Sequence, residues 1–224
     1  MKKYIVKMPI LLRWFYPRRV WAFSRRNPDV YLTFDDGPIP GVTPWVLDLL
    51  KVHDAKATFF CIGENIERHP EIYARILAEG HSVGNHSHTH LRGTATPLDT
   101  YLSDIKKCDA TMLKHRQLKN HGSKDASDST LTTKLFRPPY GRMTSKQAKA
   151  IRKKGYQIVM WDVLSADFDT EISEEKCLQN VLQSIEKGSV VIFHDSIKAE
   201  KNLRYALPKV LDFIISKGYA LRSI

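Results

Sequence analysis

Short apolar runs alternate with longer amphipathic segments along this 224-residue chain, and this alternation constrains its fold more than any other feature. Strands that alternate with helices are typical of parallel α/β proteins. At this length we expect one domain with a sizeable core. The strand-like runs cover residues 30–34, 57–62, 157–161 and 189–193, and the helical patterns cover residues 44–52, 70–79, 177–186 and 207–217.

Two adjacent carboxylates, Asp35 and Asp36, directly follow the first apolar run. Like charges this close raise at least one pKa unless a cation or a strong donor neutralises one of them, so the pair suggests a metal site or an acid/base dyad. An ordinary strand end before a Gly37-Pro38 turn is the alternative, because Asp, Gly and Pro are common turn residues. Chemistry in parallel α/β folds gathers at the carboxyl ends of strands, which favours a functional site.

Three histidines, His86, His88 and His90, stand within five positions. The i, i+4 spacing of His86 and His90 predicts two imidazoles on one side of a helical turn, with His88 directed elsewhere. Two histidines and one carboxylate form a three-ligand set that leaves a coordination position for water, as in hydrolytic metal sites. A chance cluster of solvated histidines is the alternative interpretation.

The net charge of +11 is concentrated at one end of the chain. Residues 1–26 hold eight Lys or Arg and no acid, and the remaining residues carry 27 basic and 24 acidic side chains, a net charge of +3. A basic segment on a nearly neutral body favours a surface contact through that segment over a groove for phosphates. We therefore expect no nucleic-acid partner.

Residues 1–26 mix basic residues with Trp14, Phe15 and Tyr16, and we expect this segment to pack on the domain formed by residues 27–224. Arg13 and Pro17 interrupt the apolar run within this segment, so the segment resembles neither a signal peptide nor a transmembrane helix. Peripheral contact with an anionic membrane is a second hypothesis for the same segment.

Three widely spaced cysteines, Cys61, Cys108 and Cys177, do not form the pattern of a disulfide framework. A reducing compartment fits them best, and Cys61 in an apolar run is expected to be buried. We therefore expect a cytoplasmic protein, with membrane association as the open alternative. The polar stretch 115–134 predicts a surface loop, to which we assign no role.

Four blocks in order, residues 33–38, 86–90, 137–141 and 192–195, resemble the polysaccharide deacetylase family, whose module is also called the NodB-homology domain and carbohydrate esterase family 4. The resemblance runs from about Tyr31 to the C-terminus. It implies a distorted, partly open (β/α) barrel and a hydrolase that removes acetyl groups from N-acetylated amino sugars in oligo- or polysaccharides. An O-acetyl esterase acting on decorated polysaccharide, or an amidohydrolase acting on a small amide, is the alternative within enzymes.

The resemblance also implies which residues hold a metal and which move protons. One divalent ion would be bound by Asp36, His86 and His90. Zinc is the most common ion in the family, and cobalt and other divalent ions are the alternatives. Water bound to Zn²⁺ has a pKa of roughly 7, which makes it a nucleophile at neutral pH once a base takes its proton. Asp35 is that base by analogy, and His194 is the acid that protonates the departing amine.

The third block supplies the groups around this centre. Arg137 would hold Asp35 ionised and fix its orientation. Pro139 and Tyr140 belong to a stiff turn at the substrate, in which the backbone N–H of Tyr140 would donate to the oxyanion. Trp161 would form an apolar wall for the acetyl methyl or a sugar face, although a core tryptophan is an equally good interpretation.

One block departs from the family pattern. Many members have an aspartate that orients the catalytic histidine at the position of Leu164, and leucine cannot do this. Asp167 is the first candidate to replace it, and Asp162, which shares a strand face with position 164, is the second. A catalytically dead binding protein is disfavoured, because every metal and acid/base position is occupied.

Overall fold

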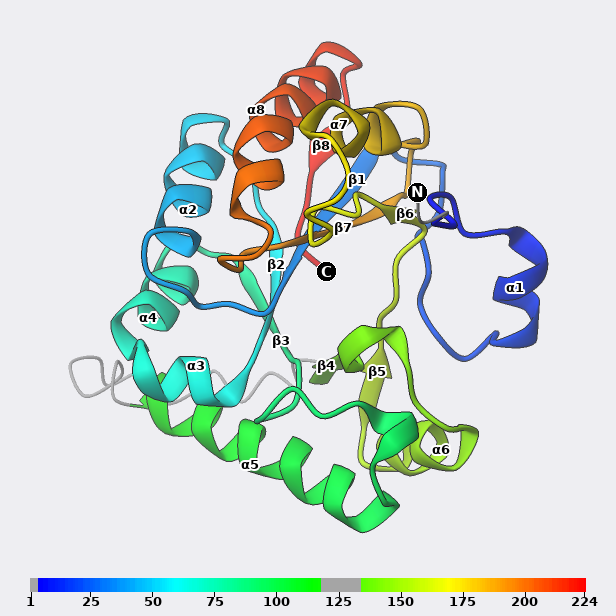
Figure 1. Cartoon of the computed structure of the whole chain (residues 1–224), viewed down its shortest axis with the longest axis vertical. Helices are drawn as coiled ribbons and strands as arrows, with labels where there is room; N and C mark the ends of the chain where they lie inside the picture. Colours follow the sequence, from blue (N-terminus) through cyan, green and yellow to red (C-terminus); the bar gives the residue numbers. More distant parts are fainter. Residues whose placement is uncertain (1–3, 118–133) are drawn as a thin grey trace.

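The computed structural model describes residues 4–117 and 134–224, and within them the strands form one parallel sheet (Figure 1). The sheet has the order β5-β4-β3-β2-β1-β7-β6, with β8 beside β1. The strands are β1 (Asp29–Asp35), β2 (Thr58–Cys61), β3 (Ser82–Asn85), β4 (Lys134–Phe136), β5 (Tyr156–Ile158), β6 (Val163–Leu164), β7 (Val190–His194) and β8 (Ala220–Leu221).

The sheet curves into a partly open barrel that has β5 and β6 at its two ends, as the resemblance implied. The N-terminal segment is hydrogen-bonded next to both end strands. The N–H of Val20 donates to the Ile158 carbonyl over 2.8 Å, and the N–H of Leu164 donates to the Val6 carbonyl over 2.8 Å. Long-range backbone pairing therefore joins this segment to the barrel.

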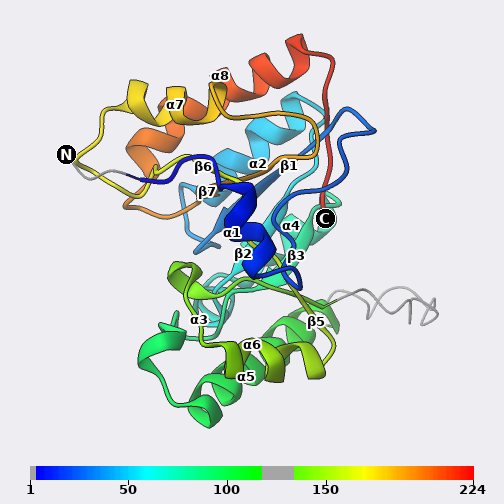
Figure 2. The same cartoon turned by 90° about the vertical axis from the view of Figure 1, so that its right-hand side faces the viewer.

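Helices cover the outside of the sheet (Figures 1 and 2). Those that the sequence predicts are α2, α4, α7 and α8, whereas α1, α3, α5 and α6 were not predicted. The helices are α1 (Ile10–Phe15), α2 (Thr43–Val52), α3 (Gly63–Arg68), α4 (Pro70–Ala78), α5 (Leu98–Gln117), α6 (Ser145–Lys153), α7 (Glu174–Leu182) and α8 (Glu200–Ser216), with the short 3₁₀ helices η1 (Gly93–Ala95) and η3 (Pro139–Gly141).

The two faces of β1 show how the sheet separates its core from its site. Val30, Leu32 and Phe34 are fully buried and belong to the cluster that packs under the outer helices. Side chains on a strand alternate between faces, so Thr33 and Asp35 point into the barrel. The alternation that builds the core thus also delivers a carboxylate to the barrel interior.

The structure agrees with some of the remaining sequence predictions and differs from others. All three cysteines are free and Cys61 is buried, as expected, and Cys108 and Cys177 are buried as well. The loop predicted at residues 115–134 lies mostly outside the described residues, but its first residues up to Gln117 belong to α5 and Lys134 begins β4. The strand predicted at 157–161 is shorter and ends at Ile158. In the described part of the chain, no helix combines the length and apolar character needed to cross a bilayer.

Candidate active site

The barrel interior holds a buried ion pair between Asp35, the last residue of β1, and Arg137, which follows β4. One guanidinium nitrogen donates to Asp35 Oδ1 and to Thr33 Oγ1, each over 2.7 Å. The other terminal nitrogen donates to the Met160 carbonyl over 2.7 Å. Arg137 is fully buried, and burial lowers its pKa while the Asp35 carboxylate opposes that change. Buried charges persist when they are paired and hydrogen-bonded, which is the case here.

Asp36 turns away from the strand and meets two histidines. Its backbone has φ 81°, a left-handed conformation that is strained for a residue with a side chain and that clusters at functional sites. Asp36 Oδ1 lies 3.2 Å from His90 Nε2 and 3.6 Å from His86 Nε2. One ligand atom from each of the three residues lies within 4.8 Å of the others.

The donor atoms fit a divalent metal ion. Asp36 Oδ1 is buried and makes no hydrogen bond within the described residues, because its close approach to His90 lacks hydrogen-bond geometry. Burial opposes the charged form of Asp36, but the contact with His90 and the charges of His194 and His86 hold its pKa well below the usual range. An ionised carboxylate oxygen and two imidazole nitrogens are the hydrolytic zinc donor set.

The imidazole of His86 is held in the tautomer that a metal ligand at Nε2 requires. Its Nδ1 lies 2.8 Å from the Arg137 carbonyl, an acceptor, so Nδ1 carries the proton and Nε2 faces Asp36. Burial lowers the pKa of His86 to about 4, against the charge of Asp35, and the ring is neutral as a ligand must be. His88 points away toward α3, with Nε2 3.8 Å from Glu67 Oε2.

The predicted helical turn at His86–His90 is wrong, although the two imidazoles do converge. These residues form an irregular loop in which Ser87 and His90 have φ of 65° and 57°. Side chains of Asn85 and Asp104 accept from the loop N–H groups: Asn85 from Ser87 over 2.8 Å, and Asp104 from His88 over 2.8 Å. A loop held by side chains thus produces the convergence that a helix was expected to give.

His194 ends β7 and stands beside Asp35, its register partner in β1. Asp167 accepts from the His194 backbone N–H over 2.7 Å and from Nδ1 over 2.8 Å. Burial alone would lower the pKa of His194, but the charge and hydrogen bond of Asp167, with smaller contributions from Asp36 and Asp35, raise it to about 9. His194 is therefore protonated at neutral pH, with Nε2 free of this interaction.

The two candidates for orienting His194 have different partners. Asp167 touches the histidine, whereas Asp162 accepts from Lys7 over 2.7 Å and from the Val190 N–H over 2.8 Å. Leu164 packs with Ala166 and Ile192 instead. The contact required of the orienting aspartate is thus made by Asp167, and its catalytic role stays a prediction.

The turn Pro139–Gly141 lies beside His90. Tyr140 in this turn has φ 60° and is 54% exposed, and the centroids of the Tyr140 and His90 rings lie 4.6 Å apart. A Cβ on Gly141 would lie 2.5 Å from the Trp161 ring, so glycine permits this close packing. Trp161 is half-buried, and its Nε1 has no partner among the described residues. Pro139 is buried beneath the turn.

Several supporting residues were not predicted from the sequence. Asp195 accepts from the Gly37 N–H over 3.0 Å and from Thr43 Oγ1 over 2.6 Å, and burial raises its pKa to about 7. Asn65 donates to the Asp36 carbonyl over 2.7 Å, and Phe168 packs edge-on against His194. Of these residues, only Asp195 could have been found from the sequence, because it directly follows His194 in one of the four blocks that resemble the family.

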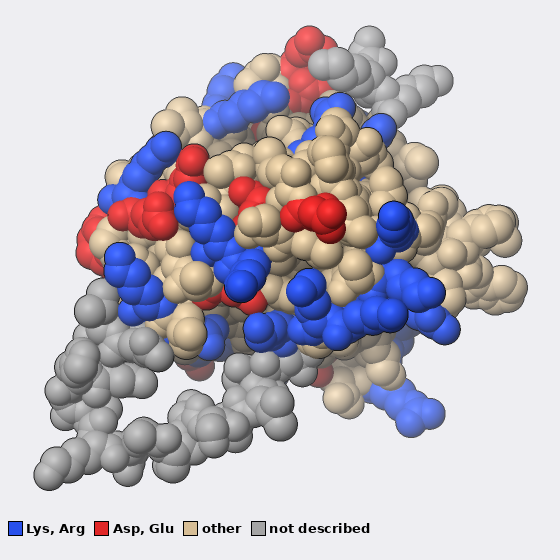
Figure 3. All heavy atoms as spheres, turned by 90° about the horizontal axis from the view of Figure 1, so that it is seen from below, with Lys and Arg blue, Asp and Glu red and all other residues tan. Residues whose placement is uncertain are grey.

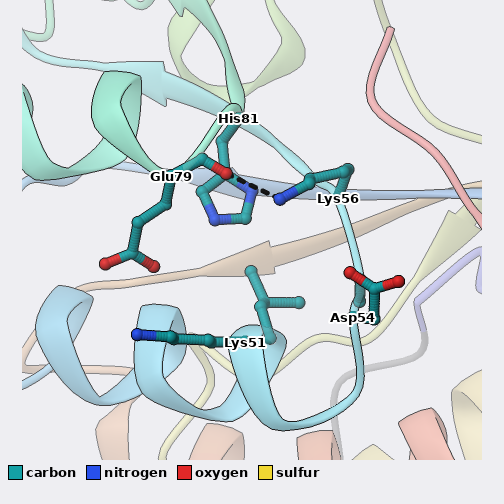
Figure 4. Close-up of a pocket in the computed structure, with 7 residues that line it drawn as sticks. Lys51, Asp54, Lys56, Glu79 and His81 are labelled. Atoms are coloured by element: carbon teal, nitrogen blue, oxygen red, sulfur yellow. Dashed lines mark hydrogen bonds between the residues drawn. The ribbon is translucent and has the colours of Figure 1, made fainter.

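Two hollows of the surface lie away from the candidate active site, and we assign no function to them. Figure 4 shows one of about 150 Å³, in which Lys56 Nζ donates to the Glu79 carbonyl over 2.7 Å. His81 Nδ1 accepts from the Ala57 N–H in the same place, and burial lowers the His81 pKa to about 4. The second, of about 990 Å³, is lined by residues that include Tyr31, Asp109 and Ile224.

The sequence matches a known family model. Residues 24–159 match the model described as "Polysaccharide deacetylase". A peptidoglycan-N-acetylglucosamine deacetylase of Bacillus cereus is 36% identical over 201 residues, which cover 88% of this chain and 68% of that protein. A chitooligosaccharide deacetylase of a Bradyrhizobium species is 33% identical over 181 residues, covering 81% of this chain and 77% of the relative.

A solved structure resembles the fold over nearly its whole length. It is a peptidoglycan N-acetylglucosamine deacetylase in complex with a naphthalenyl N-oxidanyl-benzamide, and it superposes with a TM-score of 0.83 at 30% identity. The similarity covers 97% of this chain and 95% of the other. The β1, β3, β4 and β7 ends described above therefore belong to a fold that the solved enzyme shares.

Proposed function

The chain belongs to the polysaccharide deacetylase family, and we propose that it hydrolyses the N-acetyl group of N-acetylglucosamine residues in peptidoglycan or chitooligosaccharides. Water is added across the amide bond, which releases acetate and leaves the amine on the sugar. The observation that carries this proposal is the convergence of Asp36, His86 and His90 between a base held by Arg137 and a histidine held by Asp167.

Asp36, His86 and His90 would hold one divalent metal ion, and zinc is the ion that we propose first. When bound, such an ion supplies a Lewis acid that polarises the amide carbonyl and lowers the pKa of water. The chain's contribution is a set of donors: a carboxylate oxygen with no hydrogen-bond partner among the described residues, and an imidazole whose tautomer is fixed by the Arg137 carbonyl.

Asp35 is the proposed general base. Arg137 occupies its Oδ1, and Oδ2 faces the ligand cluster at 3.8 Å from His86 Nε2. One carboxylate oxygen is thus held by a permanent cation, and the other is directed to the place where an attacking water would lose its proton. Because Asp35 is 2% exposed, bulk water does not compete for that oxygen.

His194 is the proposed general acid. Its Nδ1–H is committed to Asp167, so Nε2–H is the proton that it can deliver to the departing nitrogen. The N–H of Tyr140, in the turn beside His90, is the proposed oxyanion donor. Trp161 and the exposed Tyr140 ring supply apolar surface of the kind that packs on sugar faces.

The test is acetate release from a panel of chitooligosaccharides, peptidoglycan fragments and acetylxylan, with metal-stripped protein reconstituted with zinc or cobalt. We expect acetate from the N-acetylated glycans and restoration by about one equivalent of metal. Release only from acetylxylan would make the chain an O-acetyl esterase. Failure of the reconstituted protein to release acetate from any of the three would contradict deacetylation.

A matched pair of variants separates metal binding from proton transfer. His90→Ala is expected to lose both metal and activity, whereas His194→Ala is expected to lose activity and keep its metal. Loss of metal from His194→Ala would contradict the acid role.

A further inference from the structure

The loop around α1, residues 9–19 (the α1 loop), projects from the body of the protein (Figure 1), and its large apolar side chains face solvent. Ile10, Leu11, Trp14 and Phe15 are 62%, 69%, 75% and 77% exposed, and α1 has no buried residue. Single exposed apolar residues are ordinary, but four on one projecting turn form a patch of the kind that marks an interaction site. The core therefore does not explain why this helix is apolar.

The exposure is not the fraying of a chain end, because both ends of the α1 loop are hydrogen-bonded to the barrel. Before the loop, the Met8 N–H donates to the Asp162 carbonyl over 2.8 Å. After it, Val20 pairs with Ile158 and Met160, and the buried Trp21 donates to the Tyr16 carbonyl over 3.3 Å. A pre-formed surface loses less conformational entropy on binding.

A basic surface adjoins the α1 loop. Residues 142–154, which include α6, contain six Lys or Arg and no acid, and Lys146, Lys149 and Lys153 are exposed. Trp21, just after the α1 loop, packs in the same apolar cluster as Ile151 of α6, so the two surfaces are neighbours. Figure 3 shows a band of Lys and Arg on this side, leading toward the uncharged projection where Figure 1 places α1.

We propose that the α1 loop and α6 bind the surface of an anionic lipid bilayer, with Trp14 and Phe15 entering the headgroup region and the cations of α6 facing the lipid phosphates. Apolar and aromatic side chains flanked by Lys and Arg are the features that such a surface selects. A second copy of the chain would bring the same basic residues together, at a net charge of +11 per chain. A soluble polyanion would offer no apolar environment to the four exposed apolar side chains.

The experiment is sedimentation with vesicles of phosphatidylcholine containing about 30% phosphatidylglycerol, against vesicles of phosphatidylcholine alone. We expect the parent chain to bind the anionic vesicles and bind the neutral ones weakly. Trp14→Ser combined with Phe15→Ser should reduce the partition coefficient roughly ten-fold or more, since binding scales with inserted apolar area. Lys149→Gln combined with Lys153→Gln should cost roughly twenty-fold at low salt, and less as salt screens the charges.

A matched control removes two exposed apolar residues from other helices. Val52→Ser with Ile215→Ser, at positions 80% and 46% exposed, should bind vesicles like the parent. All variants should keep the parent's unfolding midpoint and its acetate release from a soluble glycan, so that a fold defect is recognised.

Three results would overturn the proposal. The first is vesicle binding unaffected by the Trp14 and Phe15 substitutions. The second is binding to heparin in place of vesicles. The third is a concentration-dependent dimer, lost in the aromatic variant and without vesicle binding, which would assign the face to a second copy.

Discussion

Two carboxylate–cation pairs flank the proposed metal position, and they differ in whether the cation can give up its proton. Asp35 is paired with Arg137, whose guanidinium is charged at every working pH, and both side chains are at most 3% exposed. Asp167 is paired with His194, which is 14% exposed and can titrate. One pair therefore fixes a charge, whereas the other holds a proton that can be transferred.

The difference also appears in how each cation is held. Arg137 makes hydrogen bonds to Asp35, to Thr33 and to backbone carbonyls, so nearly all of its donors are used inside the barrel. His194 makes two bonds to Asp167, one through its backbone, and leaves one ring nitrogen for chemistry. A fixed cation suits a base that must stay ionised, and a partly committed imidazole suits an acid.

Removing the fixed cation should have the largest effect. Arg137→Met leaves Asp35 buried without its partner. We expect the free energy of unfolding to fall by about 3–5 kcal/mol and acetate release to fall to the background level. Urea denaturation checks the first and acetate release the second. Arg68→Met, which breaks an exposed pair with Glu64, is the control and should cost less than about 1 kcal/mol. Equal midpoints for the two variants would show that Arg137 is not structurally required.

Removing the base without the cation should spare the fold. Asp35→Asn keeps the shape of the side chain and an acceptor for Arg137 but cannot take a proton, so we expect acetate release to fall by roughly 10³–10⁴-fold. Metal content, measured by elemental analysis, should stay at the parent level. A variant that loses its metal in step with its activity would make Asp35 a ligand and not a base.

Changing the partner of the titrating cation should have a smaller and pH-dependent effect. In the parent, the proposed acid role of His194 requires the protonated ring, so we expect activity to fall as pH rises through about 9. Asp167→Asn removes the main cause of the raised pKa, so this basic limb should move toward lower pH, with a loss of about 10²–10³-fold at neutral pH. A pH–rate profile of both proteins measures the shift, and an unmoved limb would mean that another group sets it.

The smallest expected effect concerns stability. A histidine whose folded-state pKa exceeds its unfolded value of 6.5 stabilises the fold fully below that pH, and this contribution is lost as pH rises through about 9. We expect the parent to lose on the order of 1–3 kcal/mol between these limits, and Asp167→Asn to lose less. Chemical denaturation at several pH values gives the comparison. Parallel pH curves for the two proteins would exclude Asp167 as the source.

The sequence indicated which side chains would meet at the candidate site, because most of them follow strands directly. Asp35 and His194 terminate apolar runs, and parallel pairing brings such ends together. The metal-ligand positions came from the spacing of His86 and His90, although their loop proved irregular. Resemblance to a family supplied the roles, which the strand pattern alone could not.

What the sequence did not predict depends on long-range contacts. The pairing of Val20 and Val6 with the edges of the barrel leaves no local periodicity. Asp104 holds the histidine loop from a helix that was not predicted, although Tyr101 and Ile105 are part of a buried stripe with helical spacing on α5. Asp167 and Asp162 stayed alternatives because only tertiary structure decides which carboxylate reaches His194.

The decisive measurement is anomalous X-ray diffraction at the zinc edge, from crystals of the zinc-loaded protein. We expect one strong peak, whose zinc ion lies about 2.0–2.2 Å from each of Asp36 Oδ, His86 Nε2 and His90 Nε2. A peak held by other residues, or none at this position in protein that still releases acetate, would contradict this expectation.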